Sequence, residues 1–508
     1  PKVGRDFFPT VDAGQLRLHV TAPPGTRIEE TERYFERVED VIRELIPASD
    51  RELILDQIGL PQGYSLAITD SAAMSSADGE LLVRLKHDRK HPTLHYIEEL
   101  RRELPKRFPE LGFYFQPADI VTQILNFGLP SPISIQVTGP KLTDSYATAQ
   151  AIAQRLRQTT GVTDVRVHQV LNAPRLHLDV DRVRANEVGL TERDVASDLL
   201  VTLASGGQVS PSYWVDPASG NSYPVVVQVP DTTLDSLDEL TGVSVSSPRG
   251  PQMIADLARV ERRVTPLLQS HADLQQAIEV RADVRLLDLG SIAPPVEAIV
   301  EEFRAKVPPG GAILLRGQLD SMKQGFWGLG LGLGLAVFLV YGLMVVNFQS
   351  WLDPFIILLA LPGAGAGIVI GLLLVRTPFS IPALMGAVMS VGVATANSTL
   401  MVSFANERRD AGSSSIEAAF EAGMTRLRPV LMTALAMGIG MLPMAIGHGE
   451  GGEQNAALAR AVLGGLVGAT FATLFFVPVA FSLLRARERK REVDPDLEDD
   501  APRHHADS

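Results

Sequence analysis

The stretch GVATANSTLMVSFANERR, residues Gly392–Arg409, decides how the whole chain is to be interpreted. It continues an apolar run, yet it carries hydroxyl and amide side chains and stops at two arginines. Polar groups are costly in hydrocarbon, so those kept in a membrane span usually serve a function. The stretch therefore predicts a functional membrane helix, and its neighbours must be membrane helices as well.

Five apolar runs in the C-terminal part are long enough to span a bilayer, which takes about 20 helical residues. They are Trp327–Val346, Pro354–Val375, Ile381–Ala405, Pro429–Gly447 and Ala461–Leu484. Most charged residues lie before residue 325 or after residue 484. We therefore expect a large polar block, a bundle of five transmembrane helices in residues 325–485, and a disordered cytoplasmic tail in residues 486–508.

Glycine and proline recur inside these runs. The second and fifth runs contain Gly363, Gly365, Gly367, Gly464 and Gly468. Small residues let membrane helices approach closely, so we expect these glycines at helix contacts rather than in a phosphate-binding loop. Prolines inside the runs predict kinks that neighbouring helices support, and these are Pro362, Pro443 and Pro478.

The distribution of basic residues predicts the orientation of the bundle. The loop after the third run and the tail contain Arg408, Arg409, Arg426, Arg428, Arg485, Arg487, Arg489, Lys490 and Arg491, whereas residues 448–455 contain acids but no lysine or arginine. By the positive-inside rule the basic segments are cytoplasmic, and an odd number of spans places the polar block on the opposite side. No signal peptide precedes that block, so we expect the chain to be a fragment whose preceding membrane segments are missing.

Composition and motifs exclude several classes of function. There is no cysteine among the 508 residues, which excludes thiol chemistry and cysteine-metal sites, and the net charge of -13 argues against a nucleic-acid partner. HExxH, GxSxG and Walker motifs do not occur, and the histidines do not fall at metal-ligand spacings. The polar block holds only Met74, Met253 and Met322, too few for a soft-metal relay. We expect neither an enzyme nor a bound cofactor or metal.

The polar block begins with alternating strand and helix patterns. Strands are predicted at Gln15–Thr21, Leu53–Ile58, Glu80–Lys86 and Gly112–Gln116, and helices at residues 23–45 and Leu94–Phe108. Thr26 or Thr31 is the expected cap of the first helix. The βαββαβ order is that of a ferredoxin-like split βαβ module, which we place in residues 1–118.

The same pattern then starts again and is interrupted. A strand at Ile133–Val137, a helix at Asp144–Thr160 and a strand at Asp164–Gln169 are followed, after a long detour, by a helix at Val296–Val307 and a strand at Ala312–Arg316. We expect a second module in residues 119–173 and 284–320, with an inserted docking module in residues 174–283. The insert has predicted strands at Arg175–Val180, Tyr223–Val229, Gly242–Ser246 and Ala277–Ala282. The fold class is therefore an α+β region followed by an all-α bundle.

Two loops are too long for simple connections. The loop at residues 59–79 is rich in small residues and includes Gly59, Gly63 and Tyr64. It is either a mobile gate beside a substrate path or a disordered surface loop. The excursion at residues 205–224 is expected to carry Tyr213 and Trp214 at its tip, where exposed aromatic side chains dock on another subunit more often than they bind a ligand.

The order of these parts resembles the C-terminal half of a resistance-nodulation-division (RND) transporter, most closely the multidrug (hydrophobe/amphiphile) efflux class. The segments that carry the resemblance are GRDFFPTVDAGQLRLHVTAPPGTRIEETE at Gly4–Glu32, NFQSWLDPFIILLALP at Asn347–Pro362, GVATANSTLMVSFANE at Gly392–Glu407, RLRPVLMTALAMGIGMLPMA at Arg426–Ala445, and EQNAALARAVLGGLVGATFATLFFVPV at Glu453–Val479. The resemblance as a whole covers nearly the entire chain except its tail.

The resemblance implies a homotrimeric proton/drug antiporter of the inner membrane, with a large periplasmic porter region. It implies a periplasmic adaptor protein and an outer-membrane channel as partners, besides the surrounding membrane lipid, and H+ as the coupling ion. The paired aspartates that bind the proton in this family belong to the other half. Two alternatives stay open: a heavy-metal efflux pump, and a protein-translocation component of the same superfamily.

The resemblance also assigns candidate proton-relay residues. The family's relay threonine falls on Thr433, and the asparagine beside its relay lysine falls on Asn397, but the lysine position itself is Ala396. That departure removes the cation expected to pair with the aspartates. Helical geometry adds Thr395, which shares an arc with Thr399 and Ser403 that could hold water. The alternative is that these hydroxyls only bond carbonyls of their own helix.

Overall fold

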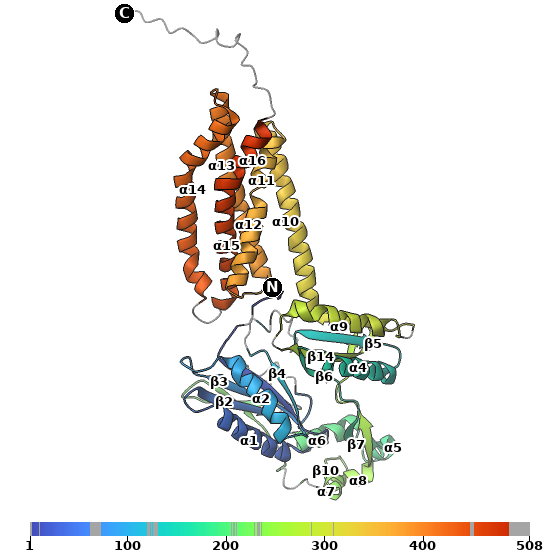
Figure 1. Cartoon of the computed structure of the whole chain (residues 1–508). Helices are drawn as coiled ribbons and strands as arrows, with labels where there is room; N and C mark the ends of the chain where they lie inside the picture. Colours follow the sequence, from blue (N-terminus) through green and yellow to red (C-terminus); the bar gives the residue numbers. More distant parts are fainter. Residues whose placement is uncertain are drawn as a thin grey trace, which may run out of the picture.

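The computed structural model describes residues 3–9, 11–60, 73–118, 122, 124, 131–204, 206, 209, 211–227, 229–230, 234, 236–285, 287–307, 309–447 and 452–486. The chain is elongated, with an α/β region (residues 3–317) at one end and a helical bundle (residues 318–485) at the other (Figure 1). This mixed region followed by a helical region agrees with the architecture predicted from the sequence.

The first half of the α/β region is one antiparallel sheet covered by two helices. Its elements are β1 (Gln15–Thr21), α1 (Ile28–Leu45), β2 (Arg51–Ile58), β3 (Asp78–Leu85), α2 (Thr93–Arg107) and β4 (Gly112–Gln116), with strand order β2-β3-β1-β4. Alternate β1 residues Leu16, Leu18 and Val20 are buried in the core that includes Val38 and Ile42 of α1. The two-residue period of β1 therefore fixes which face the helices cover.

Helix α1 begins without the predicted side-chain cap. Its N-cap position is Arg27, and no side-chain cap bond forms there. The Thr26 hydroxyl donates to the Pro23 carbonyl over 2.7 Å, and the Thr31 hydroxyl donates to the Arg27 carbonyl over 3.1 Å. The prediction that Thr26 or Thr31 caps α1 is wrong, because both hydroxyls bond backbone carbonyls rather than the free N–H groups of the first turn.

The second sheet is assembled from strands far apart in sequence. Its elements are β5 (Ile133–Thr138), α4 (Leu142–Arg157), β6 (Val162–Val167), β13 (Ser270–Ala272), β14 (Gln275–Val284), α9 (Leu289–Arg304) and β15 (Ala312–Gly317). The order is β13-β14-β5-β15, with β6 also pairing with β14. The strand predicted at Ala277–Ala282 lies inside this sheet, since Val280 pairs with Ile135 of β5, and is not part of the insert.

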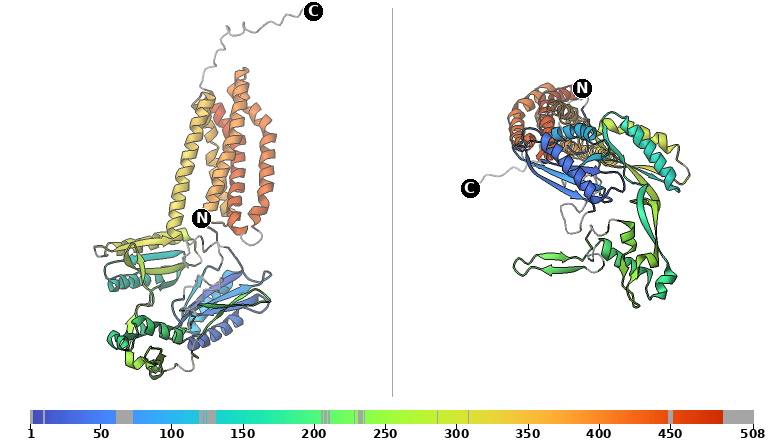
Figure 2. Two further views of the ribbon diagram at one scale, coloured as in Figure 1. Left: turned by 180° about the vertical axis from the view of Figure 1, so that it is seen from behind. Right: turned by 90° about the horizontal axis from the view of Figure 1, so that it is seen from below.

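The insert between β6 and β13 forms its own small core. Its elements are β7 (Ala173–Val180), α5 (Arg182–Glu187), α6 (Glu192–Ala204), β8 (Ser212–Val215), β9 (Ser222–Val225), α7 (Leu237–Thr241), β10 (Ser244–Val245), β11 (Gln252–Met253), α8 (Ile254–Leu257) and β12 (Ala258–Thr265). Strands β7 and β12 form an antiparallel ribbon, and the hairpin β8–β9 projects away from the rest of the chain (Figure 2).

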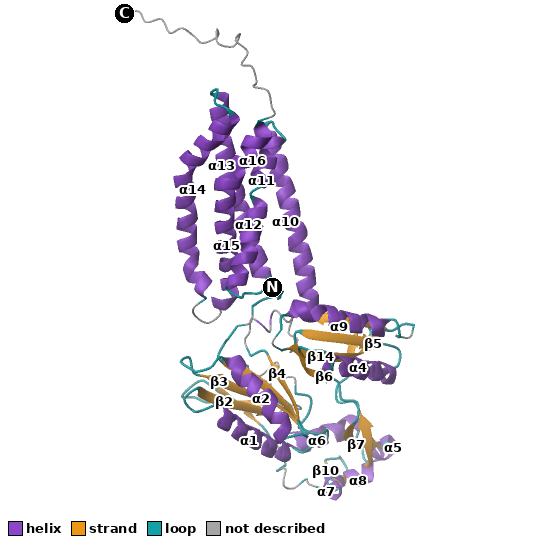
Figure 3. Ribbon diagram, viewed as in Figure 1, coloured by secondary structure: helices purple, strands orange, loops and turns teal. Residues whose placement is uncertain are grey.

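The C-terminal region consists of helices joined by short loops (Figure 3). Its helices are α10 (Gln318–Phe348), α11 (Leu352–Leu358), α12 (Leu361–Leu374), α13 (Ile381–Asp410), α14 (Ser415–Ile446), α15 (Gly452–Phe471), the π-helical turn η2 (Ala472–Phe476) and α16 (Val477–Arg485). Within the described part of the chain they make five segments long and apolar enough to cross a membrane, with α11–α12 and α15–η2–α16 each counted as one.

Glycines bring α12 and α15 into backbone contact. A β-carbon on Gly367 would overlap the Gly464 carbonyl oxygen, and one on Gly468 would overlap that of Gly363. The absence of side chains at these positions lets the two helix axes approach closely, as predicted from the sequence. The prediction is wrong for Gly365, where a β-carbon would meet no described atom within 4 Å.

Candidate functional site

Helix α13 contains the polar stretch and has one covered and one open face. It packs against α12, α14 and α15, with Ala394, Thr395 and Ser398 buried. Gly392 and Ala396 are exposed on the opposite side. Ala396, which occupies the position where the resemblance implies a relay lysine, therefore lies on a face that no described part of this chain covers.

The three predicted relay residues do not form a connected site within the chain. Thr395 is buried, and its hydroxyl donates to the Val391 carbonyl over 2.7 Å. Thr433 is exposed on α14, and its hydroxyl donates to the Val430 carbonyl over 3.0 Å. Asn397 is half-buried, and no hydrogen bond among the described residues joins it to either threonine. A relay role for these residues stays a prediction.

A hydroxyl pair that the sequence did not reveal links α13 to the last span. Ser398 and Thr473 are fully buried, and their hydroxyl oxygens are 3.0 Å apart. Thr473 lies on the π-helical turn η2, a feature often found at functional positions. The one available signal was Pro478, which lacks an N–H and predicts an irregular backbone in the preceding turn.

Charged groups gather at the end of the bundle farthest from the α/β region. The buried Asp353 carboxylate forms an ion pair with Arg485, with 2.6 Å between Oδ2 and Nη2. Arg426 lies about a third of the way along α14, with its guanidinium carbon 5.3 Å from the centre of the Phe404 ring. Its buried Nε has no hydrogen-bond partner within the described chain. Arg426 is therefore a further candidate for proton coupling. In the sequence, a charged residue just before an apolar run could have indicated it.

The start of α13 is tied to the α/β region by a short backbone strap, Gly4–Phe7. The Phe379 N–H donates to the Gly4 carbonyl, the Asp6 N–H donates to the Phe379 carbonyl, and the Ile381 N–H donates to the Phe7 carbonyl, over 2.7–3.1 Å. On its other side the strap accepts a bond from Gly290 of α9. Helix α13 and the second sheet's helix α9 therefore share one connecting segment.

A cavity of about 500 Å³ lies where the two sheets meet the helical bundle. Apolar side chains of Phe8, Leu94 and Ile97 line it together with Asp6 and Asp12. Burial, with Asp288 nearby, raises the pKa of Asp6 to about 6 although the Leu289 N–H donates to its carboxylate. The cavity therefore combines apolar walls with carboxyl groups, and burial raises the pKa of one of them, Asp6, to about 6.

An ion-pair network joins the two halves of the α/β region. Arg101 of α2 reaches Asp164 of β6 over 2.7 Å and Asp283 of β14 over 2.9 Å. Glu98 of α2 pairs with Arg285 over 2.6 Å, beside the same strand. These charges are partly buried, so they fix how the first sheet sits on the second.

The predicted gate and docking residues lie at the edges of the α/β region. Gly59 follows β2 with a positive φ of 78° and donates its N–H to the Asp78 carbonyl. Gly63 and Tyr64 lie outside the described residues. Tyr213 and Trp214 are 65% and 53% exposed, but they lie on β8 and not at the tip, which is the turn at residues 216–221. The Trp214 ring packs instead beside Tyr223 of β9.

Comparison with known proteins gives matches along nearly the whole chain. Residues 1–485 match the AcrB/AcrD/AcrF family. The chain is 26% identical over 500 residues to the cation efflux system protein CzcA of Alcaligenes sp., covering 97% of this chain and 46% of that protein. It is 30% identical over 502 residues to the nickel-cobalt-cadmium resistance protein NccA of Alcaligenes xylosoxydans xylosoxydans, covering 96% and 45%.

A multidrug protein and a solved structure are also similar. The multidrug resistance protein MdtC of Yersinia enterocolitica is 27% identical over 512 residues, covering 97% of this chain and 46% of that protein. The crystal structure of a heavy metal efflux pump has the same fold, with a TM-score of 0.75 and 24% identity, covering 96% of this chain and 49% of that one. The chain thus spans about half the length of the relatives it matches.

Proposed function

Because the chain belongs to the AcrB/AcrD/AcrF family of RND transporters, we propose that it is the C-terminal half of a proton-driven efflux pump of a bacterial inner membrane. The match across residues 1–485, over an α/β region followed by five apolar spans, is the observation that carries this proposal. The complete pump moves small molecules outward without covalent chemistry, and H+ is its coupling ion.

The open face of α13 supports proton coupling shared between two halves. Ala396 is exposed there, beside the half-buried Asn397. In the proposed pump this face meets the other half, which supplies the proton-binding carboxylates. The strap Gly4–Phe7 then transmits displacement of α13 to α9, since main-chain bonds join it to both. Arg426 and the Ser398–Thr473 pair are additional relay or positioning candidates.

The substrate we favour is an amphiphilic organic molecule. Apolar side chains and carboxyl groups together line the junction cavity, and ligand sites of this kind combine an apolar wall with a few polar groups. Residues 59–79, with Gly59, Gly63 and Tyr64, are proposed as a gate beside the substrate path. A metal cation is the second candidate, supported by relatives named for cation and nickel-cobalt-cadmium resistance.

The proposed assembly is a homotrimer that works with a periplasmic adaptor and an outer-membrane channel. We assign the α/β region to the periplasm and read its two sheets as ferredoxin-like modules with an inserted docking module. The exposed hairpin β8–β9 supports docking, because Tyr213 and Trp214 offer apolar surface to a neighbouring subunit.

Transport by the full-length protein tests the proposed function. In proteoliposomes with an imposed pH gradient, export of ethidium should depend on the gradient and should fall about tenfold in Asn397→Ala and Thr433→Ala, since each loses a polar contact to a charged relay. Matched controls are Asn347→Ala, an exposed asparagine of α10, and Ser482→Ala, whose hydroxyl also bonds a carbonyl of its own helix.

The same vesicles distinguish the two substrate classes. If Co²⁺ or Zn²⁺ moves in response to the gradient and ethidium does not, the substrate is a metal cation and not an amphiphile. Absence of proton-dependent export of either substrate would overturn the proposal of an efflux pump.

A further inference from the structure

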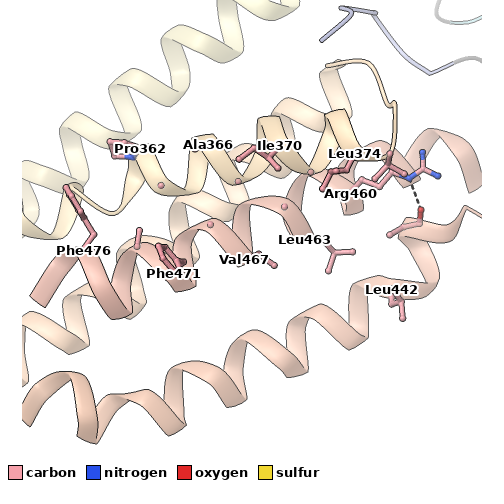
Figure 4. A pocket seen from close by; sticks show the side chains of 18 of the residues that line it. Pro362, Ala366, Ile370, Leu374, Leu442, Arg460, Leu463, Val467, Phe471 and Phe476 are labelled. Atoms are coloured by element: carbon pink, nitrogen blue, oxygen red, sulfur yellow. Dashed lines mark hydrogen bonds between the residues drawn. The ribbon is translucent and has the colours of Figure 1, made fainter. Parts of the chain in front are cut away.

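An apolar groove of about 1000 Å³ runs along the outside of the helical bundle between α12, α14 and α15 (Figure 4). Six of its lining side chains are Ile370, Leu374, Leu442, Leu463, Val467 and Phe471. Val467 and Phe471 are 71% and 66% exposed, so the groove is open toward the surroundings of the bundle. In a membrane-spanning segment those surroundings are lipid.

The groove is hollow because its floor is glycine. Gly367 and Gly371 of α12 face Gly464 and Gly468 of α15 at backbone contact, so no side chain fills the seam between the two helices. The flanking large side chains then stand as walls on either side. Close helix packing and the hollow therefore have the same cause.

One charged side chain lies at the end of this apolar surface. Arg460 lines the groove at the end nearest the α/β region, where its Nε donates to the Ala445 carbonyl and its Nη1 donates to the Thr377 hydroxyl, each over 2.9 Å. Those two bonds fix the guanidinium but use only part of its five N–H donors. No carboxylate in the described part of the chain pairs with Arg460. A cation in this position calls for an anionic partner.

We propose that the groove binds an anionic phospholipid, with an acyl chain along the glycine seam and the headgroup phosphate on Arg460. Arginine binds phosphate through paired N–H donors, and the apolar floor matches a hydrocarbon chain. An apolar protein helix in the same place would leave the guanidinium without a counter-charge. The proposal is independent of which substrate the pump transports.

The groove is also separate from the face expected to meet the other half. Helix α15 turns Gly464 and Val467 toward the groove, whereas Gly465 on its other side packs against Ser390 of α13. The open face of α13 and the groove therefore lie on different sides of α15. A second half that packs on α13 would leave the groove open to lipid.

The test measures lipid on the full-length protein. Native mass spectrometry of the purified protein, with phosphatidylglycerol or phosphatidylcholine added, should show about tenfold preference for phosphatidylglycerol, and Arg460→Gln should abolish that preference. Arg376→Gln, an exposed arginine at the same end of the bundle, is the charge control and should leave the preference unchanged.

A second variant tests the hydrocarbon part without touching the arginine. Ala366 lines the groove, whereas Val369, also exposed on α12, does not. A photoactivatable phosphatidylglycerol should label the α12 and α15 peptides in the native protein and in Val369→Phe, and should lose this labelling in Ala366→Phe. Equal labelling of the two variants, or cross-linking of the groove to a protein helix instead of lipid, would overturn the proposal.

Discussion

At the scale of single residues, Asp6 links the strap to the junction cavity. Burial raises the pKa of its carboxyl from 3.8 to about 6, so the folded protein holds this proton more tightly than the unfolded chain does. The stability gained is fully present below pH 3.8 and is lost as the pH rises through 6. At neutral pH the buried, ionised Asp6 therefore lowers the free energy of unfolding, and an uncharged side chain at this position would not.

We therefore predict that Asp6→Asn raises the melting temperature at pH 7.5 by about 2–4 °C, and much less at pH 4.5. The amide can still accept the bond from Leu289 N–H. Thermal unfolding of the full-length protein across this pH range is the measurement. Glu32→Gln, an exposed acid on α1, is the control and should show no such pH-dependent difference. A stabilisation that does not change with pH would contradict the assignment.

At the scale of elements, local pattern predicted strands and helices well. The bounds of β1 and β4 match the predicted strands, because two-residue alternation and flanking turns mark both ends. Pairing was harder to predict. The sequence pattern of β14 identifies a strand but not its partners, and its pairing with β5 spans the entire insert. The prediction that residues Ala277–Ala282 belong to the insert is therefore wrong, because β14 is a strand of the second sheet.

The candidate site was only partly predictable, for a related reason. Helical spacing correctly predicted that Thr395 and Ala396 lie on adjacent parts of the surface of α13. It could not predict which face of α13 the neighbouring helices cover. The Ser398–Thr473 pair depends on the helix packing and on a π-helical turn, neither of which has a strong sequence signal. Contacts within one helix could be expected, whereas contacts between helices could not.

We predict that Ser398 and Thr473 are energetically coupled. In a double-mutant cycle with Ser398→Ala and Thr473→Val, the coupling free energy of unfolding should be about 1 kcal/mol, because either single change leaves a buried hydroxyl unpaired. Thr470 provides the comparison, since its buried hydroxyl has no partner in the described chain. Thr470→Val should combine additively with Ser398→Ala, and additivity in both cycles would disprove the pair.

At the scale of the whole molecule, Arg101 holds the first sheet on the second. Removing it leaves the Asp164 and Asp283 carboxylates without their shared cation, which typically costs about 3–5 kcal/mol for buried pairs. We predict that Arg101→Ala increases hydrogen exchange in α2, β6 and β14 of the full-length protein while the helical bundle keeps its protection.

The neighbouring Arg102 supplies the matched control for this prediction. Its side chain is 61% exposed and pairs with Glu103 of the same helix. Surface pairs of this kind contribute at most about 1 kcal/mol, so Arg102→Ala should exchange like the native protein. Identical exchange in both variants would mean that the sheets are held together by other contacts.

The strap Gly4–Phe7 has one further consequence. All three of its bonds to the Phe379–Ile381 segment run from main chain to main chain, so they are insensitive to which side chains occupy these positions. Side chains can therefore change at Arg5–Phe7 and Phe379–Ile381 during evolution without breaking these bonds, except to proline, which removes an N–H donor. Gly4 is the exception, because a β-carbon there would lie 2.9 Å from Asp288 Oδ1. A connection made by main-chain hydrogen bonds need not show up as conserved residue types, so it is recognised from backbone geometry.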